Sequence, residues 1–358
     1  MIGHGYAARM RLGLNLGYWG LASDDDNVAL VLEAERLGFS SVWTAEAYGN
    51  DAATVLAFLA AKTTKIELGS GIFQIPGRSP AMAAMTAATI DTLSGGRFRL
   101  GLGVSGPQVS EGWHGVRFAK PLGRTREYID IVRMALARER VDYHGEHYEL
   151  PLPNGPGKAL KMIIHPIREY IPIYLAAIGP KNLELAGEKC DGWLAIFYDP
   201  EFAPELLASV NAGKEKAGRA DAPFDVMPTT PVIIGDSVEE CANPIRGYSA
   251  LYVGGMGSRE QNFYNRLACR MGFEKEAEEV QNLYLDRKYA EAAAAIPFEF
   301  IDRTALLGPV ERIAERMQAL AASGVTTVNV SGFGGSQDER IATLRSIAEA
   351  LDKSGVGD

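Results

Sequence analysis

Cysteine is scarce in this chain: the 358 residues include three, Cys190, Cys241 and Cys269, which are scattered and odd in number. This pattern argues against a disulfide framework and predicts a reducing, cytoplasmic location. Long apolar runs are also missing, since no stretch approaches the roughly 20 apolar residues that a membrane-spanning helix needs. The first ten residues lack the apolar segment of a signal peptide. We therefore expect a cytoplasmic protein without a membrane partner, beginning at Met1 or at Met10.

Clusters of basic residues are missing as well. The formal net charge is −9, and no run or stripe of Lys and Arg occurs, so a nucleic-acid partner is not expected. A small-molecule ligand held by a few local positive groups is unaffected by the overall sign of the charge. The composition is therefore compatible with a small-molecule substrate, which is the partner we expect.

Several motifs of known chemistry do not occur. The sequence has no Gly-x-Ser-x-Gly nucleophile turn, no phosphate-loop lysine motif and no zinc-ligand spacing, which weakens the hydrolase and nucleotide-triphosphatase hypotheses. Of the five histidines, His4 and His165 belong to no pattern. His144 and His147 lie in YHGEH, where strand alternation would place them on opposite faces, so no metal site is expected.

What the sequence does contain is a regular alternation of strand and helix patterns. Apolar strands are predicted at residues 12–16, 41–44, 66–68, 97–102, 172–177, 192–196, 225–234 and 325–330. Helices are predicted between them, at 24–37, 51–63, 80–94, 181–189, 204–217, 308–323 and 338–351. This alternation implies a parallel sheet, and about eight strands predict an α/β fold of the (β/α)8 TIM-barrel type.

The chain is longer than a bare barrel requires, and two segments account for the excess. Residues 144–170 are rich in Pro, Gly and polar side chains and predict a long loop with a short hairpin. Residues 258–300 contain helical patterns with no strand between them and predict a helical insertion. We expect residues 1–358 to form a single domain that carries both insertions.

The segment from Lys65 to Gly106 is the most informative part of the sequence. It has the pattern of strand, glycine-rich turn, helix and strand, and ligands of parallel α/β proteins sit at the carboxyl ends of strands. Its last six residues, from Gly101, match G-x-G-x-x-G. A dinucleotide-binding turn is disfavoured because Pro107 follows where a helix should open and no acidic strand end lies about 20 residues further on. A barrel ligand loop and a plain turn remain open.

Polar residues after other predicted strands are further candidates. Glu46 is placed for acid/base work or for capping the next helix. His114, beside Trp113, is a candidate proton donor, a wall for a planar ring or a structural histidine. Asn15 lies at the end of the first predicted strand, and we expect it to face the carboxyl end of the barrel, where the other candidates lie. The segment 178–182 lies between a strand and a helix, where free amides and a lysine could hold a phosphate or form a simple loop.

Five segments together resemble the bacterial luciferase-like superfamily, in particular the branch that uses the 8-hydroxy-5-deazaflavin coenzyme F420. They are SVWTAEAYGNDA, IELGSGIFQIPGRSPAMAAMTAATIDTLSGGRFRLGLGVSGPQVSEGWHG, KPLGRTREYIDIVR, YHGEHYELP and IPIYLAAIGPKNLELAGEKCDGW. The second segment is the most specific, and the resemblance covers most of the chain. Its glycine-rich bulge and Ser-Gly-Pro-Gln loop are similar to those of methylene-tetrahydromethanopterin reductase-like members.

The resemblance implies roles for individual residues. The bond Gly71-Ile72 corresponds to a non-proline cis peptide bond, in a bulge that backs the deazaflavin ring. Ser105, Gly106 and Gln108 correspond to residues that contact the coenzyme. The residues that correspond to the loop near its phosphate are Ala176, Ala177, Gly179 and Pro180, at the end of the strand predicted at 172–177. Lys181 follows them directly and is a further candidate. The resemblance also suggests a homodimer.

One departure from the family bears on the reaction. Sugar-phosphate dehydrogenases of the family carry an Asp-His pair where this chain has Glu46-Ala47, so the imidazole for alcohol oxidation is missing. Glu46 would then supply or relay a proton while the reduced coenzyme donates hydride to an unsaturated acceptor. The resemblance implies an F420-dependent oxidoreductase acting on a small organic substrate. The alternatives are an FMN-dependent luciferase-like monooxygenase and a non-catalytic barrel that binds a flavin or deazaflavin.

Overall fold

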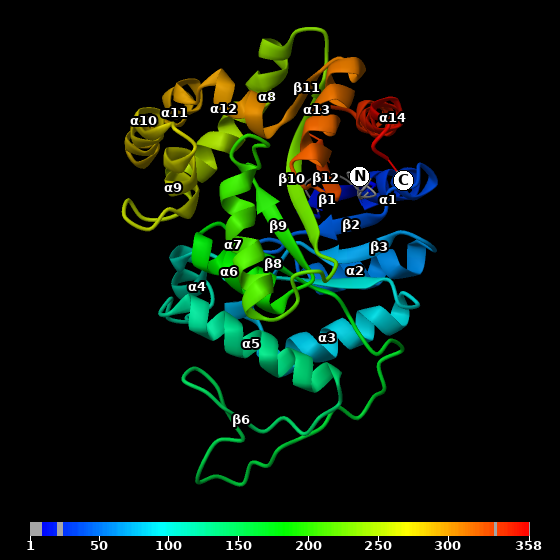
Figure 1. Ribbon diagram of the computed structural model, residues 1–358, viewed down its shortest axis with the longest axis vertical. Helices are drawn as coiled ribbons and strands as arrows, with labels where there is room; N and C mark the ends of the chain where they lie inside the picture. The colour runs from blue at the N-terminus through cyan, green and yellow to red at the C-terminus, as the bar shows by residue number, and fades with distance from the viewer. Residues whose placement is uncertain (1–8, 20–23, 333–334, 358) are drawn as a thin grey trace, which may run out of the picture.

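The computed structural model describes residues 9–19, 24–332 and 335–357, and its centre is a closed barrel of eight parallel strands. Each strand pairs with the next in the barrel, and pairing of β12 with β1 and of β9 with β10 closes the ring. The prediction of a TIM barrel is confirmed (Figure 1). The strands are, in barrel order, β1 (Arg11–Gly17), β2 (Ser41–Thr44), β3 (Glu67–Ser70), β5 (Phe98–Gly103), β8 (Ile173–Ala176), β9 (Gly192–Ile196), β10 (Asp225–Ile234) and β12 (Thr327–Gly332).

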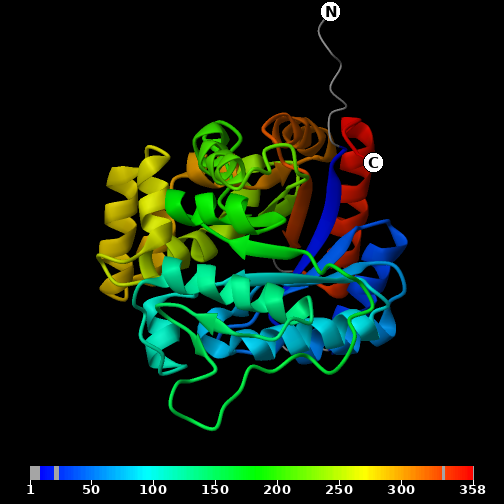
Figure 2. The same ribbon diagram turned by 60° about the horizontal axis from the view of Figure 1, so that its bottom comes forward.

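Helices cover the outside of the barrel, as the alternating pattern predicts (Figures 1 and 2). Their ends follow from local sequence signals. Asp51 caps α2 by accepting a hydrogen bond from the Thr54 amide, and Ser79 with Pro80 opens α3 in the same way. The outer helices are α1 (Asp24–Arg36), α2 (Ala52–Lys62), α3 (Pro80–Leu93), α5 (Pro121–Leu136), α6 (Pro180–Lys189), α7 (Ala203–Lys216), α13 (Val310–Ala322) and α14 (Gln337–Ser354).

The amino-terminal end of the barrel is closed by a buried ionic cluster. The Asp225 carboxylate, 8% exposed, lies 3.2 Å from the Arg11 guanidinium and 3.3 Å from that of Arg99. It also accepts hydrogen bonds of 2.9 Å from the hydroxyls of Tyr174 and Thr327. Because these donors converge on one carboxylate, this cluster holds five barrel strands together, β1, β5, β8, β10 and β12, at the end opposite the expected ligand site.

Two segments depart from the regular alternation, where the sequence predicts insertions. The first carries the antiparallel hairpin β6 (Tyr143–His144) and β7 (Glu149–Leu150), followed by residues 151–170, which contain no helix or strand. This loop projects beyond α3 and α5 (Figures 1 and 2). The second is entirely helical between residues 258 and 300, and its helices are α9 (Phe263–Arg270), α10 (Glu274–Leu285), α11 (Tyr289–Ala295) and the beginning of α12 (Phe298–Thr304).

Several short elements differ from the sequence prediction. The predicted helix at 308–323 begins at Val310, because residues Leu306–Gly308 form a strand, β11, that extends the sheet beside the end of β10. Pro309 then caps the helix. β4 (Phe73–Gln74) and the single 3-10 turn η1 (Ile75–Gly77) were also not predicted. Strands of two or three residues leave too little periodicity for a pattern to detect.

The remaining helices lie between β5 and α5 and between β10 and α9. They are α4 (Pro107–Gly112) and α8 (Val238–Ala250), the latter continued by a π-helical turn over Leu251–Gly255. Among the residues that the structure describes, no helix combines the length and the apolarity that crossing a bilayer requires.

Candidate active site at the carboxyl ends of the strands

The bond between Gly71 and Ile72 is a cis peptide bond, as the resemblance implies. It lies between the end of β3 and the start of β4, at the carboxyl end of the barrel. The Gly71 amide donates a 2.8 Å hydrogen bond to the carbonyl of Thr44, which ends β2. The bulge is therefore tied to the neighbouring strand and turns Ile72 toward the barrel mouth.

Ile72 lies against the ends of the next two strands of the barrel. A methyl group at Gly103 would be 2.7 Å from the Ile72 Cδ1 atom and 3.5 Å from the Ala176 Cβ atom. Gly103 therefore leaves just enough space for the Ile72 side chain, with Ala176 on the other side. The carboxyl ends of three successive strands, β3, β5 and β8, thus form one surface. It contains two predicted cofactor-binding residues, Ile72 and Ala176, with Gly103 between them.

Gly101, the first glycine of the apparent dinucleotide motif, serves the packing of strands. A methyl group here would lie 1.9 Å from the backbone oxygen of Ser70, which is closer than any two such atoms can approach. The buried Ser70 hydroxyl donates to the Gly101 carbonyl at 2.8 Å and accepts from the Gly101 amide at 2.9 Å. The spacing of glycines in this segment thus reflects the barrel and not a dinucleotide fold.

The loop after β5 presents Ser105, Gly106 and Gln108. Ser105 has a φ of 58°, in the left-handed region that residues other than glycine rarely occupy and that is enriched at binding sites. Gly106 is the cap residue of α4, and Pro107 is its first helical residue. Pro107 opens this helix, so the prediction that no helix begins here was wrong; proline at the first helical position loses no hydrogen bond. Gln108 is exposed and lies beside Gly106.

Glu46 lies after β2 with its carboxylate almost fully buried and fully engaged. Its two oxygens accept hydrogen bonds from the backbone amides of Ala52 at 3.1 Å and Gln74 at 3.2 Å, and the Arg78 guanidinium forms an ion pair with the same carboxylate. Arg78 also pairs with Asp51 and lies 4.3 Å from the Phe73 ring centre. This arrangement joins the loop after β2 to the segment after β3.

Gln74 connects the two residues that the sequence singles out for catalysis. Its side-chain NH2 donates to the Glu46 carbonyl at 3.1 Å, and its side-chain oxygen pairs with Nε2 of His114. Because that oxygen is only an acceptor, the network assigns the proton of the imidazole to Nε2. Gln74 is not among the residues predicted from sequence, although a glutamine between Phe73 and Ile75 is an unusual polar residue in a buried apolar run.

The loop before α6 brings together some, but not all, of the residues expected near a phosphate. Ala176 is half-buried, and the carbonyl of the buried Ala177 accepts a 2.8 Å hydrogen bond from the Trp193 indole. Gly179 caps α6 without a side-chain hydrogen bond, and Pro180 opens the helix. Lys181 is 77% exposed and pairs with Glu184 at 2.8 Å on the surface, as the simple-loop alternative expects.

Asn15 lies at the end of β1, across the mouth from Gly103. Its side-chain NH2 donates to the Ser331 hydroxyl at the end of β12, at 3.3 Å. Its side-chain oxygen accepts from the amide of Gly17 at 3.4 Å. The Asn15 side chain thus bridges two adjacent strand ends, on the rim where the sequence predicts it.

Aromatic side chains gather at the ends of β9 and of the helices that follow β10. Phe197, with a φ of 50°, has its ring centre 5.7 Å from that of Tyr252, which is 4.8 Å from that of Tyr264. Burial, with the neighbouring Tyr252 and Tyr48, raises the pKa of Tyr18 to about 12. These phenols stay protonated at neutral pH, so the cluster offers apolar faces and neutral hydroxyl groups to a ligand.

Comparison with known proteins now places this geometry in a family. Residues 9–327 match the model of the family described as "Luciferase-like monooxygenase", and the chain belongs to this family. A protein from Mycobacterium tuberculosis named "Putative coenzyme F420-dependent oxidoreductase Rv3520c" is 45% identical to the chain, over 94% of this chain and 99% of the relative.

Two reductases extend the comparison. The 5,10-methylenetetrahydromethanopterin reductase of Archaeoglobus fulgidus is 31% identical over 82% of this chain and 86% of that protein. The solved structure of the coenzyme F420-dependent tetrahydromethanopterin reductase from Methanopyrus kandleri superposes with a TM-score of 0.80, covering 95% of this chain and 98% of that one. Its sequence identity is 24%, so this likeness concerns the fold.

Proposed function

We propose that this protein is an F420-dependent oxidoreductase that transfers a hydride between the deazaflavin coenzyme and a small organic substrate. The observation that carries the proposal is the surface formed by Ile72, Gly103 and Ala176 at the ends of three neighbouring strands. The 45% identity to the M. tuberculosis relative, over nearly the full length of both chains, and the similarity to the A. fulgidus reductase support it.

The residues at the mouth fit a planar tricyclic ring with a polar edge. A flat apolar wall requires small residues beside one branched side chain, and Gly103 and Ala176 flank Ile72 in this way. Ser105 and Gly106 would face the polar edge of the ring, and the loop at 176–180 would lie near the phosphate. The coenzyme supplies the hydride chemistry, whereas the protein supplies position and electrostatics.

The proton-transfer partner is proposed to be His114 and not Glu46. The Glu46 carboxylate is held by two backbone amides and by Arg78, so it has a positioning function in the segment that carries Gln74. His114 is fixed through Nε2 by Gln74, so Nδ1 accepts a proton from a ligand in the neutral imidazole and donates one in the imidazolium form. The imidazolium form would supply, from Nδ1, the proton that hydride addition to an unsaturated C=C or C=N acceptor requires.

The aromatic cluster is proposed as the substrate side of the site. Tyr18, Phe197 and Tyr252 come from three different elements and would enclose a small organic molecule between apolar rings and neutral hydroxyls. Ala47 occupies the position of the histidine in the family's sugar-phosphate dehydrogenases, which disfavours alcohol oxidation. We also propose that the chain forms a homodimer, which light scattering of the purified protein would measure.

Coenzyme binding, followed by the fluorescence of the four tryptophans, tests the proposal. We expect a dissociation constant for F420 in the micromolar range or below, and no comparable binding of reduced FMN. The reverse preference would support an FMN-dependent monooxygenase. A second measurement tests catalysis: the reduced coenzyme is mixed with a panel of activated enones, imines and quinones. If the protein binds the coenzyme but oxidises it with none of them, the non-catalytic alternative is favoured.

His114→Gln separates the proton-transfer role from a structural one. The amide of glutamine can keep a hydrogen bond to Gln74 but cannot exchange a proton near neutral pH. We expect an unchanged coenzyme affinity, a turnover about 10²-fold lower, and a pH profile that differs from that of the wild type. A variant with the wild-type turnover and pH profile would contradict the role of His114.

A further inference from the structure

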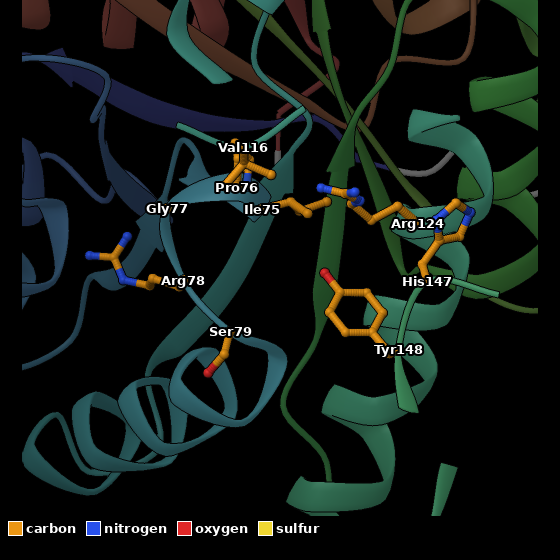
Figure 3. A pocket seen from close by; sticks show the side chains of 9 residues that line it. All are labelled: Ile75, Pro76, Gly77, Arg78, Ser79, Val116, Arg124, His147 and Tyr148. Atoms are coloured by element: carbon orange, nitrogen blue, oxygen red, sulfur yellow. The ribbon is translucent and has the colours of Figure 1, made fainter. Parts of the chain in front are cut away.

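A cavity of about 320 Å³ lies outside the barrel mouth, between the start of α3 and the start of α5. One wall is the η1 turn with Ser79, and the other is formed by Arg124 of α5 and by His147 and Tyr148 of the β6–β7 hairpin. Figure 3 shows the Arg124 guanidinium and the Tyr148 hydroxyl extending into the space between these walls. None of the functions proposed above uses this cavity.

The cavity carries a positive charge that nothing in the described chain neutralises. The Arg124 guanidinium has no hydrogen bond or ion pair with any described residue, and no Asp or Glu lines the cavity. Arg78, the other cation in the lining, is paired with Glu46 and Asp51, and its guanidinium points away from Arg124 in Figure 3. Arg124 is therefore the cation available to a ligand.

Two polar side chains beside Arg124, those of His147 and Tyr148, also lack a hydrogen-bond partner among the described residues. The His147 side chain is 9% exposed, and its Nε2 atom is buried without a hydrogen bond; the nearest carboxylate, that of the exposed Glu146, is 4.0 Å away and pairs with Lys120. The Tyr148 hydroxyl makes no hydrogen bond to any described residue. A buried polar group without a partner costs free energy, so such groups commonly mark a place for a ligand or an ordered water.

The position of this hairpin is fixed by its contacts with α5. The Glu127 carboxylate accepts hydrogen bonds from three successive backbone amides, at residues 146–148, over distances of 2.8 to 3.0 Å. Gly123 lets one edge of the imidazole approach the helix, because a methyl group there would be 2.8 Å from Nε2 of His147. Because the Glu127 carboxylate binds these backbone amides, His147 and Tyr148 are held in place beside Arg124 before a ligand binds.

We propose that this cavity binds the phosphate or carboxylate group of a small-molecule ligand, with Arg124 as the charged anchor and with His147 and Tyr148 as hydrogen-bond donors. The starts of α3 and α5 add positive helix ends to the same space. A smaller pocket shares Ile75 and Arg124 with the cavity and reaches Val104, next to the Ser105 loop. The anionic group could thus belong to the coenzyme's side chain, which rests on the proposed function, or to the substrate.

Arg124→Gln tests the site, with Arg36→Gln as the control. Arg36 is 62% exposed on α1, so its substitution removes the same charge far from the cavity. The first measurement is thermal stabilisation by inorganic phosphate at constant ionic strength. We expect phosphate to stabilise the wild type and the control, and Arg124→Gln to weaken phosphate binding about 10- to 100-fold, as expected for a lost charged hydrogen-bond pair. No stabilisation of the wild type, or an equal one in Arg124→Gln, would overturn the proposal.

The second measurement distinguishes the sources of the anion. If the group belongs to the coenzyme, Arg124→Gln weakens binding of F420 by the same factor and leaves binding of a deazaflavin without the anionic side chain unchanged. If it belongs to the substrate, F420 binding is unchanged and phosphate binding alone is lost. A wild type that binds phosphate but no F420 would remove the proposed function and leave the anion site standing. Tyr148→Phe, which deletes one hydroxyl, should weaken phosphate binding less than Arg124→Gln, and an equal or greater effect would refute Arg124 as the anchor.

Discussion

Two glycines on β5, two residues apart, offer a sharp test of how the barrel and the proposed ring site share this strand. Gly101→Ala would place a methyl group 1.9 Å from the backbone oxygen of Ser70. Backbone in the barrel cannot move away without breaking strand pairing. Gly103→Ala would place a methyl group 2.7 Å from the Cδ1 atom of Ile72, which is the far end of a flexible side chain.

The two substitutions should therefore differ in size of effect: Gly101→Ala should mainly reduce stability, and Gly103→Ala should mainly weaken coenzyme binding. Gly101→Ala should lower the free energy of unfolding by about 2–6 kcal/mol, from overpacking of about 1–3 kcal/mol and two hydrogen bonds to Ser70 at about 0.5–1.5 kcal/mol each. At an unfolding entropy of about 2.1 cal/mol/K per residue, this corresponds to a fall in Tm of about 3–8 °C. Gly103→Ala should lower the free energy of unfolding by about 0.5–1.5 kcal/mol, because the new methyl group forces the Ile72 side chain away from its preferred rotamer.

Coenzyme affinity then separates the two roles. Gly103→Ala pushes Ile72 into the proposed ring site, so F420 binding should weaken at least about 10-fold, which is 1.4 kcal/mol. The assay is tryptophan fluorescence for binding, with Tm measured by scanning calorimetry on the same samples. Wild-type Tm in Gly101→Ala would refute the close approach of β3 and β5. Wild-type F420 affinity in Gly103→Ala would refute Ile72 as the wall of the ring site.

Three further outcomes follow from buried or paired ionisable groups. Asp225→Asn should lower the free energy of unfolding by about 1.5–3 kcal/mol, since it removes one charged partner of Arg11 and leaves the Arg99 guanidinium paired with Glu67 alone. It should leave F420 affinity unchanged, and wild-type stability in a urea titration would contradict this account. The hydrogen bonds from Arg126 lower the pKa of Glu188 to about 2, so its contribution is present above the unfolded pKa of about 4.3 and is lost as the pH falls toward 2. The Tm difference between wild type and Glu188→Gln should therefore shrink between pH 7 and pH 3, and a constant difference would argue against the pairing. Burial raises the pKa of the Cys190 thiol to about 12, so mass spectrometry should find Cys190 unlabelled by a thiol reagent at pH 8 until the protein unfolds.

The barrel could be predicted from sequence because its signals are local. Apolar strands of four or more residues, such as Ser41–Thr44 and Gly192–Ile196, and capping residues such as Asp51 lie within a few positions of the structure they specify. The cis bond at Gly71-Ile72 was predicted by resemblance, because the residues around it match a family pattern. Lengths and caps are properties of a single segment, so one sequence is enough to read them.

The contacts of the site were not predictable in the same way, because they join residues far apart in the chain. Glu46 and Arg78 are 32 residues apart, and their pairing is the reason for proposing a positioning role for Glu46. Arg124 and His147 line one cavity because the hairpin folds back on α5. The alternation argument for YHGEH concerned metal binding and took no account of the helix beneath the hairpin. Such facts depend on the register and packing of the whole barrel.

The two ends of the described chain meet at one place. Met10 forms a parallel bridge with Gly357, and the Met10 amide donates a 2.7 Å hydrogen bond to the carbonyl of Val356. This contact lies at the amino-terminal end of β1, whereas the proposed site lies at the opposite, carboxyl end of the strands. A biosensor surface or a fusion partner attached through either end would therefore leave the barrel mouth open to ligands, so the affinities predicted above can be measured on immobilised protein.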